Sequence, residues 1–356
     1  MDNKFTRESL EKKFRFSEFF SEKLITGIAL LSITIIALIF FFVFREAAPC
    51  FNRSTDGTRT GLDEISSMSD IAPEQYGLPG DSLFYQPSVE QESTETGSGE
   101  GTVTIGSLTG KKWLPVSGEP RFGLVPLIIG TFKITLIAIL FAAPLAIFAA
   151  LFSSSFAPSW LREIIKPAVE LLAGFPSVVI GFFALMVMAS VLQQVFGYST
   201  RLNAFVGGIA MALAAIPVIF TITEDALSAV PASYKEASLA LGASKWQTAW
   251  LVTLPAATPG IFAAVLLGIG RVFGETMIAL MATGNAALNS VNPFESVRTL
   301  AATIGAEMAE VVFGDTHYRV LFLIGSLLFL FTFSLNAVAE FYIRGRLVKR
   351  FMGRTA

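Results

Sequence analysis

Six long apolar runs dominate the pattern of hydrophobic and polar positions along the chain. A transmembrane helix needs about 20 mostly apolar residues, because it must cross roughly 30 Å of hydrocarbon. Six runs meet that length: Leu24–Phe44, Leu124–Phe152, Pro167–Phe196, Leu202–Thr223, Pro259–Thr283 and Val320–Ile343. The pattern predicts an all-α polytopic membrane protein with six transmembrane helices.

The first run, Leu24–Phe44, contains no charged residue and is followed by Arg45 and Glu46. A secretory signal peptide has a shorter apolar region and ends in small residues at a cleavage site. We therefore interpret this run as a transmembrane helix that is retained.

Internal prolines occur in three of the later runs, at Pro144, Pro176 and Pro217. Proline removes one backbone donor from a helix, and neighbouring helices can satisfy the carbonyl group that this frees. These positions indicate a packed bundle rather than isolated helices.

Basic residues at both ends of the chain predict its orientation. The first run is preceded by Lys4, Arg7, Lys12, Lys13, Arg15 and Lys23, and the last is followed by Arg344, Arg346, Lys349, Arg350 and Arg354. Cytoplasmic flanks carry an excess of Lys and Arg, so we expect both termini in the cytoplasm. Two cytoplasmic termini require an even number of spans, which agrees with six.

This topology divides the chain into five segments. They are a cytoplasmic N-terminal segment (1–23), the first transmembrane helix (24–44), a periplasmic segment (45–123), a transmembrane domain (124–343) with a cytoplasmic loop at 224–258, and a basic cytoplasmic tail (344–356). Residues 88–110 are mainly Ser, Thr, Gly and Glu, a composition that forms no apolar core. We expect the periplasmic segment to be partly disordered, and we favour a tolerated insertion over a binding domain.

Composition excludes several classes of function. The chain is 53% hydrophobic and 15% charged, whereas soluble domains are about 25% charged. Its net charge of −2, without a block rich in Lys and Arg, excludes a nucleic-acid partner. Cys50 is the only cysteine and His317 the only histidine, so neither a disulfide framework nor a Cys/His metal cluster can form.

The segment Gly110–Trp113 resembles part of a phosphate-binding loop but does not complete it. Ile105 stands where the loop needs its first glycine, and Lys112 stands where it needs Ser or Thr. The sequence contains no other loop of this kind. We therefore expect that the chain binds no cofactor, is not an enzyme and does not hydrolyse ATP itself.

The predicted cytoplasmic loop, Glu224–Thr258, contains the segment EASLALGASKWQTAWLVTLP at Glu236–Pro255. Its spacing resembles the EAA motif of ABC-importer permeases, which is Glu-Ala-Ala, three residues, Gly, nine residues, Ile, one residue and Leu-Pro. The matching positions are Glu236, Ala237, Ser238, Gly242, Val252, Leu254 and Pro255. Ser replaces the second Ala and Val replaces Ile, while every spacing is kept. The resemblance implies that this loop docks into an ATPase subunit.

The residues of the loop favour a helix, a turn and a second helix. Ala237 and the three residues after Ser238 favour helix, and Gly242 can end that helix. A short amphipathic helix is then expected, with Trp246, Ala249 and Trp250 on one face. Two large aromatic side chains on that face suit burial in a partner's groove. The alternative is a helix that lies on the lipid headgroups, where Trp is also common.

Two opposite charges lie inside the fifth apolar run. Arg271 falls at its centre, and Glu275 lies four residues further on, so both side chains share one helical face. Because each charge costs roughly 2.5–3.5 kcal/mol in the bilayer, we expect the pair to face the bundle interior or a water-filled path. Gly268, Gly270 and Gly274 are expected to let other helices approach closely. Charge position alone leaves two interpretations equally open, an oxyanion site and a permanent structural ion pair.

The charged residues outside this pair are expected to lie at the membrane interface or in solvent. Glu170 follows Lys166 by four residues and is expected at the cytoplasmic interface. The segment 284–318 is expected to be an external loop with a short helix and a solvated charged face. Its charges are Glu295, Arg298, Glu307, Glu310 and Asp315.

Three segments, 121–139, 170–183 and 268–281, resemble the permeases of the phosphate-specific (Pst) importer, and within it the PstC type. That family carries a Gly-Arg-x-x-Gly-Glu-Thr-Met run in its fifth span. The run is matched by Gly270, Arg271, Gly274, Glu275, Thr276 and Met277. The resemblance covers about residues 113–345. It implies a type I ABC-importer permease architecture and places Arg271, Glu275 and Thr276 in the translocation pathway of phosphate.

The same resemblance implies partners. They are a second permease of the PstA type, a dimer of ABC ATPases of the PstB type that binds ATP and Mg, and a periplasmic phosphate-binding protein of the PstS type. Glu236, Ala237, Gly242, Trp246, Leu254 and Pro255 are the residues expected to couple the ATPase to transport. The other expected partner is the lipid bilayer of the bacterial inner membrane.

Four alternatives stay open at this point. A permease for sulfate or molybdate keeps the loop but is expected to lack the Gly-Arg-x-x-Gly-Glu run. A PstA-type sibling shares the Arg-x-x-Gly-Glu-Thr core, and Met277 favours PstC. A secondary transporter has no use for the EAA loop. A role as a phosphate sensor that signals to a regulatory kinase is compatible with transport.

Overall fold

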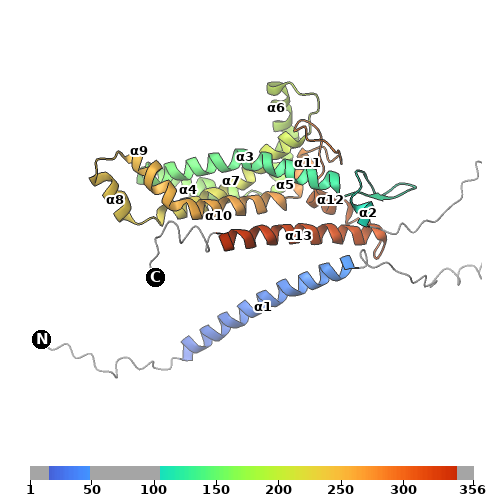
Figure 1. Cartoon of the computed structure of the whole chain (residues 1–356), viewed down its shortest axis with the longest axis horizontal. Coiled ribbons are helices and arrows are strands. Elements are labelled where there is room, and N and C mark those ends of the chain that lie inside the picture. Colours follow the sequence, from blue (N-terminus) through green and yellow to red (C-terminus); the bar gives the residue numbers. More distant parts are fainter. Residues whose placement is uncertain (1–15, 49–104, 343–356) are drawn as a thin grey trace, which may run out of the picture.

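The computed structural model describes residues 16–48 and 105–342, which form a bundle of long helices (Figure 1). The predictions for residues 1–15, 49–104 and 343–356 lie outside the described residues. They include the disorder expected for residues 88–104 and the placement of the basic tail. In chain order, the described elements are α1 (Phe16–Ala47), α2 (Ile105–Leu108), β1 (Trp113–Leu114), β2 (Arg121–Phe122), α3 (Val125–Ser155), α4 (Ser159–Gly174), α5 (Ser177–Phe183), the π-helical turn η4 (Ala184–Met188), α6 (Ala189–Phe196), α7 (Ala204–Ser228), α8 (Ala232–Ala240), α9 (Lys245–Thr248), the π-helical turn η5 (Ala249–Thr253), α10 (Leu254–Phe273), α11 (Met277–Ala282), α12 (Leu300–Glu307) and α13 (Thr316–Tyr342).

Five helical stretches in the described part of the chain are long and apolar enough to cross a membrane. They are Val125–Ser155, Ser177–Phe196, Ala204–Ser228, Lys245–Phe273 and Thr316–Val338. The expectation of a polytopic helical membrane protein is therefore confirmed. The sixth expected span, Leu24–Phe44, lies within α1, which packs beside α13 through contacts such as Phe42 on Phe322. Its crossing of the membrane stays a prediction.

Small residues hold the centre of the bundle together. Gly207 and Gly208 of α7 face Ile134 and Ile137 of α3, and a Cβ atom on either glycine would lie within 3 Å of an isoleucine side chain. Such residues let two helix backbones approach closely, which is how helices associate where no water drives them together. The packed bundle that the internal prolines indicated is present, with Pro144 and Pro217 inside α3 and α7.

The third apolar run is two helices rather than the single span expected at Pro167–Phe196. Phe175 and Pro176 have extended backbones that separate α4 from α5. The physical reason is that a residue before proline avoids the helical region. The span therefore begins at Ser177, and Glu170 lies exposed on the preceding helix, α4, which has no buried residue.

The bounds predicted for the fifth span are also wrong. The helix expected at Pro259–Thr283 begins at Lys245, runs through α9, η5 and α10, and ends at Phe273. Pro255 has no N–H to continue the hydrogen-bond ladder, and the π-helical turn η5 lies directly before it. The Leu-Pro pair at the end of the EAA motif therefore lies inside a membrane helix instead of closing a loop.

The end of the segment that was predicted to be periplasmic is folded against the bundle. β1 and β2 pair antiparallel, with Trp113 opposite Phe122, and both side chains are buried. They pack in one cluster with Leu127 of α3 and Leu321 of α13. Residues 105–110, which were expected to lack order, contain α2 and contribute Leu108 to this cluster. This small hairpin is a minor departure from an all-α fold.

Candidate functional site

Gly242 forms the turn of the EAA loop. Its φ of +85° lies in the left-handed region that favours glycine. The N–H of Ala243 donates to the Ser238 carbonyl at 3.2 Å, and the N–H of Gly242 donates to the Leu239 carbonyl at 3.0 Å. These two bonds close α8 with a Schellman motif. The predicted role of Gly242 as the end of the first loop helix is confirmed.

Side chains on both sides of the turn fix the helix that follows. Ser244 accepts from the N–H of Gln247 at 3.2 Å, and the Gln247 side chain accepts from the N–H of Ser244 at 2.8 Å. This capping box satisfies donors that are otherwise free at a helix start. The hydroxyls of Ser238 and Thr248 share a hydrogen bond of 2.9 Å between the two helices. The loop is therefore a preformed helix–turn–helix.

One face of this helix–turn–helix is uncovered. Helix α8 has no buried residue, and Glu236 and Ala237 are exposed on it. Leu241 is 89% exposed, and Tyr234 and Leu239 are also exposed. Exposed apolar side chains gathered on a short loop are typical of an interaction surface. We call Tyr234, Leu239 and Leu241 the α8 surface.

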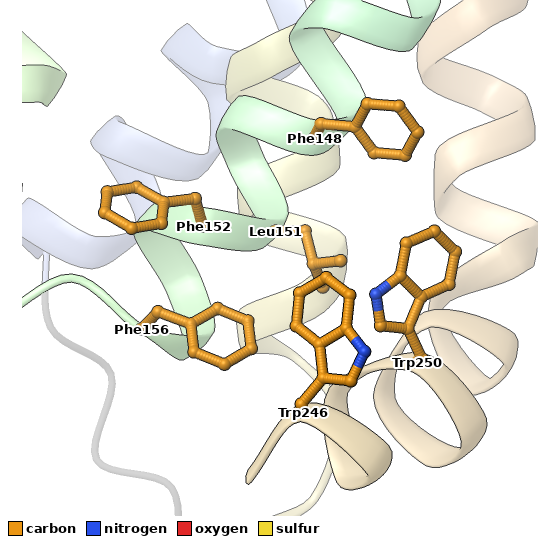
Figure 2. Close-up of a pocket in the computed structure, with 6 residues that line it drawn as sticks. All are labelled: Phe148, Leu151, Phe152, Phe156, Trp246 and Trp250. Carbon is orange, nitrogen blue, oxygen red and sulfur yellow. The ribbon is translucent and has the colours of Figure 1, made fainter.

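The aromatic face of the second helix is turned the other way. Ala249 is buried, and Trp250 is half-buried with its ring 6.0 Å from that of Phe148 on α3. Trp246 packs on Phe156 at 5.6 Å and is 58% exposed (Figure 2). Helix α3 thus covers the Ala249 and Trp250 part of the expected face, while burial of Trp246 in a partner's groove stays a prediction.

Arg271 and Glu275 lie at the end of α10 rather than at the centre of a span. Arg271 is in the last turn of α10, and Glu275 follows the terminal Gly274. Nη2 of Arg271 lies 4.0 Å from Oε2 of Glu275, and their side chains are 50% and 6% exposed. The pair is thus brought together, but by a helix end and a break instead of one continuous helical face.

The helix end lies inside the bundle. Phe273, two residues after Arg271, stacks on Phe331 at 4.0 Å and contacts Phe132 at 5.5 Å. Phe331 lies near the middle of α13, so this level is well inside the helix layer. Arg271 therefore remains a charge within the membrane-crossing part of the fold, roughly 25 Å along α10 from Pro255 at the end of the EAA motif.

The glycines around Arg271 have different surroundings. A Cβ atom at Gly268 would lie 2.6 Å from Ile219, so this residue allows close helix packing as expected. At Gly270 nothing lies within 4 Å, and at Gly274 only the carbonyl of Gly270 does. Close approach at these two positions is not found. Instead, small residues leave open space beside a half-exposed guanidinium.

Thr276 packs against α12. It precedes α11 as its N-cap residue, and a Cβ atom on Gly305 of α12 would clash with its Cγ2. The break between α10 and α11 therefore packs directly on α12. An anion that reached Arg271 would lie beside its half-exposed guanidinium, the buried carboxylate of Glu275 and the break between α10 and α11.

Two charged residues of the spans were missed from the sequence. Lys133 of α3 donates to the carbonyls of Ser290 and Asn292 at 2.9 and 3.0 Å. Glu224, interpreted as the start of the loop, is buried in α7, where its Oε1 accepts from Ser153 at 2.8 Å. For Lys133, a lone charge inside an apolar run was the available signal. Glu224 directly follows a run and precedes Asp225, so it gave no such signal.

A largely buried polar cluster between the β1–β2 hairpin, α12 and α13 was also missed. Glu307 accepts from Nη2 of Arg298 at 2.6 Å, from Nε1 of Trp113 at 3.1 Å, and pairs with Nε2 of His317 at 2.8 Å. The side chains of Arg298 and Glu307 are only 16% and 13% exposed. The expectation of a solvated face is wrong for these two residues, because the hairpin and α13 close over them. The expected short helix is α12.

Burial alone raises the pKa of Glu307, but its partners outweigh this effect. Hydrogen bonds from His317 and Trp113, together with the positive charge of Arg298, hold the pKa of Glu307 below its ordinary value. Glu307 lies on α12, outside the five spans. Its carboxylate therefore stays ionised and ties three separate elements together.

The chain is similar to known membrane transport proteins. Residues 142–346 match the family described as binding-protein-dependent transport system inner membrane component. The chain is 36% identical over 233 residues to the probable ABC transporter permease protein YqgH of Bacillus subtilis (strain 168), covering 65% of this chain and 75% of that protein. It is 35% identical over 255 residues to the phosphate transport system permease protein PstC of Mesorhizobium japonicum, covering 66% and 77%. The MetNI methionine ABC transporter in an inward-facing conformation superposes with a TM-score of 0.49 at 18% identity, over 61% of this chain and 94% of that one.

Proposed function

This chain belongs to the family of binding-protein-dependent transport system inner membrane components, and we propose that it is the permease subunit that carries inorganic phosphate across the bacterial inner membrane. Family membership makes it a multi-pass inner membrane subunit of an ABC importer, not an enzyme, with the ATPase on a separate chain. The proposal adds the substrate, the pathway residues and the identity of the partners.

The half-exposed guanidinium of Arg271 is the observation that carries the proposal. A guanidinium presents paired N–H donors that match two oxygens of a phosphate. Gly270 and Gly274 carry no side chain that would crowd the guanidinium, and nothing lies within 4 Å of a Cβ atom built on Gly270. Glu275, 4.0 Å away, would hold Arg271 in place when the site is empty and limit how tightly an anion binds. The likeness to PstC proteins supports phosphate among the possible oxyanions.

The α8 surface is the proposed contact with the ATPase. Tyr234, Leu239 and Leu241 are exposed on a helix–turn–helix that its own hydrogen bonds hold in shape. A rigid surface can transmit the closing of a partner without first having to fold. The continuous helical stretch Lys245–Phe273 then connects this surface to Arg271. In this arrangement Glu236, Ala237 and Gly242 shape the contact with the ATPase. Leu254 and Pro255 shape the start of α10.

We further propose six spans with both termini in the cytoplasm, in the type I importer architecture. The partners would be a second permease of the PstA type, a PstB-type ATPase dimer that binds ATP and Mg, and a PstS-type phosphate-binding protein. The open side of Arg271 would then face the second permease, so that the pathway lies between the two chains. ATP binding would draw the two EAA loops together, and hydrolysis would reset them.

Transport by the whole importer in proteoliposomes tests this proposal. ATP-driven uptake of phosphate, sulfate and molybdate is measured for the native protein, for Arg271→Gln, and for Arg319→Gln as an exposed control at the start of α13. We expect phosphate to be the preferred substrate, Arg271→Gln to lower its uptake at least tenfold, and the control to keep it. Preferred uptake of sulfate or molybdate contradicts the substrate, and undiminished uptake by Arg271→Gln contradicts the pathway.

A further inference from the structure

An aromatic cavity lies between α3 and the second helix of the EAA loop (Figure 2). Its volume is about 280 Å³, and its lining residues are Phe148, Leu151, Phe152, Phe156, Trp246 and Trp250. This is below the roughly 300–1,000 Å³ of typical small-molecule sites. The lining is almost wholly apolar, so the cavity does not suit a soluble charged ligand.

One polar atom faces this apolar space without a partner. Nε1 of Trp250 is buried and has no hydrogen-bond partner among the described residues. Figure 2 shows the indole nitrogen on the side of Trp250 that looks toward Leu151 and Trp246. A buried N–H that lacks an acceptor is costly. The side chains that line the cavity are Phe, Leu and Trp and offer no acceptor, so an acceptor for this N–H has to come from another molecule.

The cavity continues an exposed apolar stripe on α3. Phe141, Leu145, Phe148 and Phe152 follow at helical spacing, and all four are exposed on this membrane-crossing helix. The stripe runs along an exposed side of α3 to the cavity at the end near the EAA loop. Lipid chains that cover the stripe therefore reach the cavity directly.

Positive charge lies beside the mouth of the cavity. Lys245, exposed, directly precedes Trp246 at the start of α9. Arg162 of α4 donates to the carbonyls of Ser153 and Ser154, which follow the lining residue Phe152 in the chain. Basic residues at a membrane surface attract anionic phospholipids, at about 1 kcal/mol for each Lys or Arg.

We propose that this cavity binds one acyl chain of an anionic phospholipid from the leaflet on the side of the EAA loop. The N–H of Trp250 donates to an ester carbonyl of the lipid, and Lys245 lies near the headgroup. The lipid thereby connects α3 to the helix that carries the EAA motif. This inference requires a membrane protein but does not depend on the transported substrate.

Native mass spectrometry of the whole transporter tests the proposal. The complex is transferred from nanodiscs that contain phosphatidylglycerol and phosphatidylethanolamine, and retained lipid is counted after mild delipidation. We expect the native complex to keep one phosphatidylglycerol for each copy of this chain. Leu151→Trp fills the cavity and should release it. Trp250→Phe keeps an aromatic side chain but removes the N–H together with the volume of the five-membered ring, and should weaken retention up to about tenfold.

Trp160→Phe is the matched control, because this exposed tryptophan of α4 does not line the cavity. Equal retention by Trp250→Phe and the native complex overturns the proposal, even if Leu151→Trp fails to fold. Retention of phosphatidylethanolamine instead of phosphatidylglycerol overturns the anionic preference. A cross-link that places a side chain of the ATPase in the cavity identifies a protein contact instead, and also overturns it.

Discussion

The hydroxyl oxygens of Ser238 and Thr248 lie 2.9 Å apart and share a hydrogen bond that joins α8 to α9 across the turn at Gly242. Ser238 occupies the position where the EAA motif has its second alanine. The substitution is therefore a structural feature of this chain, since an alanine there leaves the buried Thr248 without this partner. The bond stiffens a loop that we propose transmits force.

Removing either hydroxyl should loosen the loop by a similar amount. We expect Ser238→Ala and Thr248→Val each to destabilise it by about 1 kcal/mol, and the double variant by little more than either alone. Amide hydrogen exchange of residues 232–248 in the assembled transporter measures this. Fully additive effects of the two changes contradict a direct bond between them.

Gly242→Ala should weaken coupling, because an L-residue at a φ of +85° is strained. The expected penalty is about 1 kcal/mol, enough to open the Schellman turn more often. We expect ATP hydrolysis to persist while phosphate uptake per ATP falls. Gly174→Ala is the control, since that glycine has open space around it and no positive φ. Equal uptake per ATP in the two variants counts against a coupling role for the turn.

The sequence predicted those features that depend on neighbours along the chain. Gly242 ends a helix because of local backbone geometry, and the EAA spacing identified the loop around it. The apolar runs located the spans because the length of a span depends only on bilayer thickness. The position of Arg271 and Glu275 inside an apolar run marked them, and the family resemblance then favoured a role in transport. The structure brings the two side chains within 4.0 Å of each other.

The features that were missed depend on contacts between distant segments. The sequence around Trp250 reads as an amphipathic helix, but nothing in it shows that Trp250 packs on Phe148 of α3. Glu307 looks like one of several loop acids until Trp113, 194 residues away, donates to it. The break at Gly274 was hidden because the apolar run continues through it. Hydrophobicity marks which residues lie in the bilayer but not where the helix ends.

Glu224 should respond differently to loss of charge and loss of volume. Its Oε1 accepts from Ser153, while its Oε2 is buried and has no partner among the residues that the structure describes. An ionised carboxylate in that state is unfavourable. We expect Glu224→Gln to keep or raise the thermal unfolding temperature and Glu224→Ala to lower it. A marked loss with Glu224→Gln would mean that the charge itself is needed in this conformation.

Acid should weaken the cluster at Glu307. Because the pKa of Glu307 is lowered in the folded protein, the unfolded chain binds its proton more readily, at a pKa of about 4.3. The stabilisation from Glu307 is therefore complete above that pH and is lost as pH falls through the lower folded pKa. At pH 7 we expect Glu307→Gln to destabilise the protein by about 2 kcal/mol, since the charged acceptor of three donors is removed.

Thermal unfolding of the transporter between pH 7 and pH 3 measures this effect. The difference between the native protein and Glu307→Gln should be largest near neutral pH and should shrink as pH falls below about 4.3, because both proteins then carry an uncharged side chain at this position. Glu310→Gln, an exposed carboxylate three residues away, is the control and should change stability little at any pH. A difference for Glu307→Gln that stays constant down to pH 3 would mean that hydrogen-bond geometry, and not the charge of Glu307, holds the hairpin, α12 and α13 together.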